Sequence, residues 1–114
     1  MKAFTDISQS KKLAEILSLQ SADMCYVRAY FEGKQSDWFV NLGKPIKSDD
    51  VIPCWSLAAL LGVLPKVINN ETLFIETSAA LWHIGYRDIY TARADNPIDA
   101  CVTIIERLHE LNLL

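Results

Sequence analysis

Three cysteines and two histidines are the residues of this sequence best suited to catalysis or metal binding. Cys25, Cys54 and Cys101 are widely spaced, lie among apolar neighbours and form no CxxC pair, so they predict neither a zinc site nor a redox pair. Free cysteines in such surroundings usually pack as small hydrophobic side chains. We therefore expect no metal and no cofactor.

Cys54 is the best candidate for a nucleophile. The sequence places it at the start of a helix, where the helix dipole lowers the pKa of a thiol. His83 or His109 would then have to act as the base. The alternative is a purely structural role, in which Cys54 packs in the core and both histidines are surface groups. We favour this alternative, because free cysteines usually pack in the core and the acidic residues add no recognisable catalytic motif. A small cysteine-dependent enzyme is the second hypothesis.

A strand around Tyr26 offers a different chemistry. Alternation of side chains along this segment puts Tyr26, Arg28 and Tyr30 on one face. Two tyrosines beside an arginine can stack on a planar ligand, and Trp82 and Tyr86 would enlarge the surface if they joined the same sheet face. The alternative is an ordinary strand face covered by a helix, with the arginine reaching solvent. The three residues are our candidates for a binding face.

Residues 53–64 form an apolar segment between Pro53 and Pro65. A proline suits the first helical turn and a second one stops a helix, so we expect a helix over 53–64 that is apolar nearly all round. Either it is buried on several sides, or Trp55 is an exposed anchor for a protein partner. Together with the apolar residues 111–114, this helix leads us to expect a homodimer.

The order of the remaining elements predicts the fold class. The last helix is the best defined, because Asn96 is a good N-cap, Pro97 occupies the first helical position and Asp99 favours the helix dipole. The order α-β-β-α-β-β-β-α predicts an α+β protein with an antiparallel sheet of about five short strands and helices packed on it. The other expected elements are a helix at 8–18, strands at 24–31, 72–77, 80–86 and 88–92, and a strand carrying Trp38, Val40 and Leu42.

The length and charge of the chain limit the classes of protein to which it can belong. A chain of 114 residues fits a single domain, residues 1–114. The longest charge-free run, 51–65, is shorter than the roughly 20 residues that span a membrane, and no signal peptide is recognisable at the start, so we expect a cytoplasmic protein. The net charge is −3 and no basic cluster stands out, which argues against a nucleic-acid partner.

Two segments carry a resemblance. Residues 52–65 (IPCWSLAALLGVLP) and 95–101 (DNPIDAC) resemble segments of small uncharacterised bacterial proteins of prophages and other mobile elements. The second segment is more loosely similar to part of HicB-like antitoxins. The first group has no assigned activity to transfer to any residue. The leading hypothesis is therefore a non-catalytic binding or protein-interaction module of a bacterial mobile element.

Overall fold

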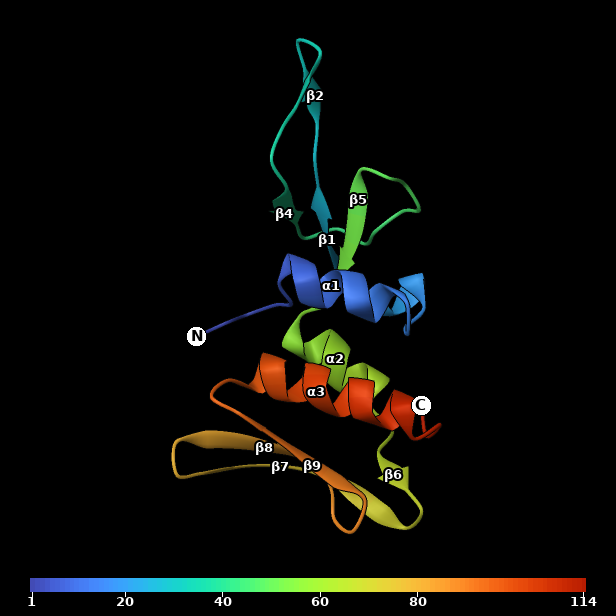
Figure 1. Ribbon diagram of the computed structural model, residues 1–114, viewed down its shortest axis with the longest axis vertical. Helices are drawn as coiled ribbons and strands as arrows, with labels where there is room; N and C mark the ends of the chain where they lie inside the picture. Colours follow the sequence, from blue (N-terminus) through green and yellow to red (C-terminus); the bar gives the residue numbers. More distant parts are fainter.

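Helices form the middle layer of the molecule and separate two β-sheets. The computed structural model describes all residues, 1–114, and shows one sheet on either side of the stacked helices (Figure 1). The helices are α1 (Ile7–Ala14), the short 3-10 helix η1 (Leu19–Ser21), α2 (Leu57–Val63) and α3 (Pro97–Glu110). The strands are β1 (Met24–Val27), β2 (Tyr30–Phe31), β3 (Lys34–Gln35), β4 (Phe39–Asn41), β5 (Val51–Cys54), β6 (Val67–Ile68), β7 (Glu71–Ser78), β8 (Leu81–Tyr86) and β9 (Tyr90–Ala94).

The α+β class with antiparallel strands is confirmed, and the strands divide into more than one sheet. One sheet has the order β4-β1-β5 and the other β6-β7-β8-β9, while β2 and β3 form a separate hairpin. The molecule is elongated, 55 × 29 × 20 Å. Its radius of gyration of 15.4 Å exceeds the roughly 13 Å of a compact domain of this length. No helix has the length and apolar character needed to cross a bilayer.

Two hydrophobic clusters correspond to the two sheets. The larger cluster has 16 buried residues and joins α3 and α2 to the four-stranded sheet, with Ile84 and Ile105 fully buried in it. The smaller has only four buried residues, Met24, Tyr26, Ile52 and Cys54, on the three-stranded sheet. Most of the apolar surface that stabilises the fold is therefore buried at the α3 end.

Side chains cap the start of α1 and, as predicted for Asn96, the start of α3. Asp6 and Gln9 form a reciprocal capping box at the start of α1, and the side chain of Asn96 accepts a hydrogen bond from the Asp99 amide at the start of α3. The first helix is shorter than expected, because it ends at Ala14 and the backbone of Ser18 is extended.

The segment 51–64 differs from the predicted helix in its first half. Residues Val51–Cys54 pair with β1 as an edge strand, where Pro53 is tolerated because an outward position needs no amide hydrogen. The helix begins only at Leu57, after Ser56, whose side chain caps it. Trp55 lies between strand and helix and is fully buried, so it is not an exposed anchor.

Gly85 allows β8 and β9 to approach each other closely. It lies inside β8, opposite Thr91 of β9. A Cβ atom at this position would lie 2.2 Å from the carbonyl oxygen of Tyr90, so only glycine allows the two strands to approach this closely.

Two-residue turns connect β6 to β7 and β7 to β8, and all four of their residues have positive φ. The first turn uses Asn69 (φ 49°) and Asn70 (φ 67°), a residue type that tolerates the left-handed region. The second uses Ala79 (φ 51°) and Ala80 (φ 62°), for which that region is strained. The β7–β8 hairpin is therefore closed by a turn that is not optimal for its geometry.

Replacing the alanine turn should stabilise the protein. The double substitution Ala79→Asn with Ala80→Gly supplies the preferred residues for this turn, and we expect it to raise the free energy of unfolding by about 1–2 kcal/mol. Urea denaturation measures the change. The matched control, Asn69→Ala with Asn70→Ala, should lower the free energy of unfolding, and a gain in that variant would contradict the explanation.

Candidate functional site

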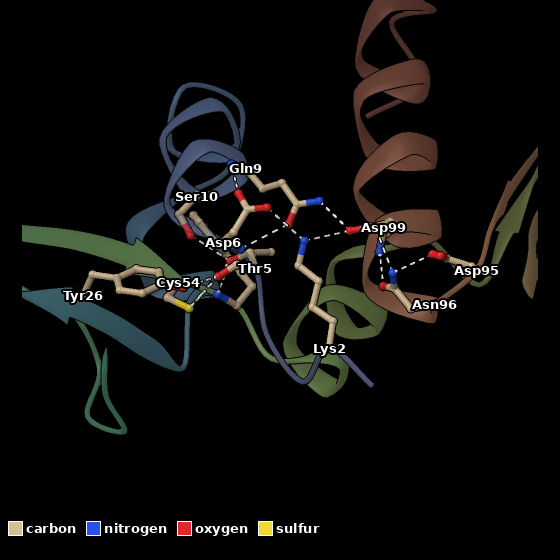
Figure 2. A network of polar contacts seen from close by, with 11 residues as sticks. Lys2, Thr5, Asp6, Gln9, Ser10, Tyr26, Cys54, Asp95, Asn96 and Asp99 are labelled. Atoms are coloured by element: carbon tan, nitrogen blue, oxygen red, sulfur yellow. Dashed lines mark hydrogen bonds and ion pairs between the residues drawn. The ribbon is translucent and has the colours of Figure 1, made fainter. Parts of the chain in front are cut away.

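Thr5 is the centre of a buried polar cluster, which we call the Thr5 cluster: Thr5, Ser10, Tyr26, Cys54 and Trp55 (Figure 2). Thr5 makes two hydrogen bonds with the backbone of Trp55: its amide donates to the Trp55 carbonyl at 3.0 Å, and its side-chain hydroxyl accepts from the Trp55 amide at 3.1 Å. Its hydroxyl lies 2.8 Å from the Ser10 hydroxyl, and its carbonyl accepts from the Tyr26 hydroxyl at 2.7 Å. The cluster thus links the N-terminal segment, α1, β1 and β5.

Cys54 is a member of this cluster and has no contact with solvent. Its sulfur lies 3.6 Å from the Thr5 hydroxyl and donates towards the Thr5 carbonyl at 3.5 Å. Burial raises the pKa of the Cys54 thiol, although hydrogen bonds from Thr5 and Ser10 act in the opposite direction. It occupies the end of strand β5 and not a helix N-terminus, so the helix dipole expected to activate it is missing.

The structure does not bring either histidine to Cys54. His83 lies on β8 in the other sheet, with its ring nitrogen 3.3 Å from the Ser78 carbonyl. His109 lies near the end of α3, in a groove to which Cys54 does not contribute. The pairs proposed for the cysteine-dependent enzyme are therefore not assembled in this conformation.

Next to the Thr5 cluster, a second polar network ties the N-terminal segment to α3 (Figure 2). Lys2 lies 2.9 Å from the carboxylates of both Asp6 and Asp99, and the Gln9 amide donates to Asp99 at 2.7 Å. Partial burial acts to raise the pKa of Asp99, but hydrogen bonds from Lys2, Gln9 and Asn96 outweigh it and hold that pKa below its ordinary value of 3.8. All these groups have partners within the protein, so the network is structural.

The predicted face Tyr26–Arg28–Tyr30 is divided by the fold. Tyr26 is buried, while Tyr30 lies beyond the end of β1 and is 61% exposed. Arg28 bonds the Asp50 carboxylate at 3.0 Å and its guanidinium lies 4.6 Å from the centre of the Trp38 ring. Trp82 and Tyr86 belong to the four-stranded sheet, so the larger aromatic platform does not form.

Residues 28–50 run from β1 to β5, and we call them the arm: they include β4 of the three-stranded sheet and the β2–β3 hairpin that projects beyond it (Figure 1). The arm carries five of the eleven large hydrophobic side chains that are exposed on the protein. These five are Tyr30, Phe31, Phe39, Leu42 and Ile46, with exposed fractions from 51% to 79%. Exposed apolar side chains that gather in one segment of a soluble protein mark interaction sites.

The turn residues of 43–50 indicate a loop, but the strand expected to carry Leu42 ends at Asn41 and leaves Leu42 79% exposed. Gly43, Pro45 and the run 48–50 are turn residues, so the apolar Leu42 and Ile46 among them had no regular element to bury them. Apolar residues inside a loop are expected to lie at the surface. Of the predicted binding residues, only Arg28 and Tyr30 belong to the arm.

A groove of about 380 Å³ lies between the C-terminal ends of α1 and α3. It is lined by Lys12, Glu15, Ile16, Glu106, His109 and Glu110. Although three carboxylates and a histidine occur here, no set of three His, Cys, Asp or Glu side chains converges closely enough to hold a metal ion. Glu110 is already paired with Arg107 at 3.0 Å.

Comparison with known proteins adds no functional assignment. No protein-family model, curated protein or solved structure matches the chain. The function must be inferred from the surface and the contacts described above.

Loss of the Thr5 hydroxyl should destabilise the protein. Thr5→Val keeps the shape of the side chain but leaves the Trp55 amide without its acceptor, so we expect a loss of about 1–3 kcal/mol in the free energy of unfolding. Thr103→Val, at an exposed position of α3, is the matched control and should change stability by no more than about 0.5 kcal/mol. Equal urea midpoints for the two variants would disprove the central role of Thr5.

The three thiols should react slowly in the native protein. All three are buried, and burial raises the pKa of Cys101 to about 12 and also raises those of Cys25 and Cys54. Because the thiolate is the reactive form, labelling with a disulfide reagent at neutral pH should be slower than in denaturant by roughly tenfold or more. Rapid native labelling, mapped to Cys54 by mass spectrometry, would instead support the enzyme hypothesis.

Proposed function

We propose that this protein is a non-catalytic protein-interaction module and that the arm is its binding element. The observation that carries the proposal is the group of exposed apolar side chains on residues 30–46. Their exposure is greatest at Phe31 (76%) and Leu42 (79%), which are the kinds of side chain that become anchors when a partner covers them.

The hairpin at the end of the arm supports this reading. The strands β2 and β3 pair over only two residues each, Tyr30 with Gln35 and Phe31 with Lys34, and all four residues are exposed. An isolated two-stranded hairpin is at best marginally stable in water, because nothing covers either of its faces. A bound protein surface would supply that cover.

The charge of the arm favours a second copy of the chain as one partner. Residues 28–50 carry four Lys/Arg and four Asp/Glu, so the whole net charge of −3 lies on the rest of the molecule. Two copies therefore meet with the least repulsion through their arms. The same balance gives no basic surface for a nucleic acid. We therefore place the interface of the expected homodimer on the arm and not at Trp55, which is buried.

The proposal extends to the origin and location of the protein. The resemblance of residues 52–65 and 95–101 to proteins of bacterial mobile elements supports an origin in such an element. Three free cysteines without a disulfide are consistent with a reducing compartment, and we place the protein in the cytoplasm.

Removing the two most exposed apolar side chains of the arm should weaken self-association. We expect the double variant Phe31→Ser with Leu42→Ser to lower the association constant at least tenfold, because burying each side chain contributes about 1.5–3 kcal/mol. Sedimentation equilibrium between about 1 and 100 μM measures the change against a 12.9 kDa monomer.

The control removes exposed apolar side chains outside the arm. Val67→Ser with Leu114→Ser should associate as the unmodified protein does. A monomer at every concentration would refute self-association. If, in addition, the arm variant and the control captured the same proteins from cell extract in equal amounts, the arm would not be the binding element.

A further inference from the structure

The outer edge of β7 is paired over only part of its length. Strand β6 lies beside the first residues of β7, and the last contact is the Leu73 amide donating to the Lys66 carbonyl at 2.9 Å. At Pro65 the chain leaves this edge, and the Pro65 carbonyl accepts a hydrogen bond from the Tyr86 hydroxyl instead. From residue 74 to the end of β7, no strand covers the outer edge.

The pairing fixes which backbone groups of β7 are free. Because Leu73 bonds outward to Lys66, and residues of a strand point their amides to alternate edges, the odd-numbered residues of β7 face outward. The even-numbered residues face β8, opposite residues 85, 83 and 81. The amide and carbonyl groups of Ile75 and Thr77 therefore form an unpaired row at the edge of the sheet.

The side chains beside this row define what could bind there. Ile75 lies opposite the fully buried Ile84, on the sheet face that α3 covers, but it is itself 45% exposed. Glu76 lies on the other face, beside His83 and Arg93 in one cross-strand row, and belongs to none of the ion pairs of the protein. A strand placed here would meet one apolar side chain and one free carboxylate.

We propose that this edge binds an extended segment of a partner protein as an additional antiparallel strand. The segment has aliphatic side chains beside Ile75 and Thr77 and a lysine or arginine opposite Glu76. Backbone hydrogen bonds to residues 75 and 77 supply the affinity, and the alternating side chains supply the selectivity. The site lies across the helical layer from the arm and is independent of it (Figure 1).

Charge argues against a second copy of the chain as the added strand. A symmetric pairing centred on the free segment 74–78 puts the Glu76 residues of the two copies directly opposite each other, and like charges in that position are destabilising. Moving the pairing towards Leu73 brings the added strand against Lys66, which already occupies that edge. A partner segment with a basic residue opposite Glu76 avoids both the repulsion between carboxylates and the overlap with Lys66.

The test uses the synthetic peptide acetyl-Ser-Thr-Val-Lys-Val-Thr-Ser-amide, whose two valine amides face β7 in this arrangement. Titration into the labelled protein, followed by NMR, should shift the amides of residues 74–78 with a dissociation constant of about 1 mM or below. A peptide with glutamate in place of lysine should bind about two- to fivefold more weakly. A peptide with both valines N-methylated should not bind, because it lacks the two donors.

A pair of substitutions at one position completes the test. Thr77→Pro removes only an outward amide, so the β7–β8 pairing and the fold remain while peptide binding is lost. Thr77→Val keeps the amide and should bind as the unmodified protein does. Equal binding to the two variants, equal binding of the N-methylated peptide, or no shift at about 5 mM peptide overturns the proposal. The N-methylated peptide decides the outcome if Thr77→Pro does not fold.

Discussion

The hydrogen bonds of Thr5 are the contacts on which the arrangement of the smaller sheet depends. Thr5 precedes α1 in the chain but exchanges hydrogen bonds with Trp55, about fifty positions further on, and its carbonyl accepts from Tyr26. The cluster of apolar residues on this sheet has only four buried members, which is too few to hold strands and helix by burial alone. A buried and fully hydrogen-bonded polar cluster fixes their relative positions, because any shift would leave a buried donor without its acceptor.

Those same hydrogen bonds place Cys54 in surroundings unlike those of a reactive thiol. A reactive thiol needs partial exposure and a positive neighbour, whereas this one is surrounded by Thr5, Ser10 and Tyr26, and burial raises its pKa. The nearest basic residue of the N-terminal segment, Lys2, is engaged by Asp6 and Asp99. Cys54 therefore packs within the Thr5 cluster, while Lys2 joins the N-terminal segment to α3.

The sequence predicted the elements that local signals determine. Asn96 and Pro97 predicted the start of α3, because capping involves residues only three apart. Position 54 was assigned to a helix because Pro53 suits either a first helical turn or an edge strand, and only the pairing with β1 decides between them. The free edge of β7 could not be predicted for the same reason, since it follows from where β6 ends and not from the residues of β7 itself.

The unequal size of the two hydrophobic clusters has a consequence for how the molecule opens. The cluster of sixteen buried residues joins α2 and α3 to the four-stranded sheet and also includes Leu13 and Trp55, whereas the cluster on the sheet that bears the arm has four. Partial unfolding requires the least free energy where the fewest apolar contacts must separate. The arm and its sheet should therefore unfold transiently while α3 and β7–β9 stay folded. Amide hydrogens at the two ends of the molecule should then exchange with solvent on separate timescales.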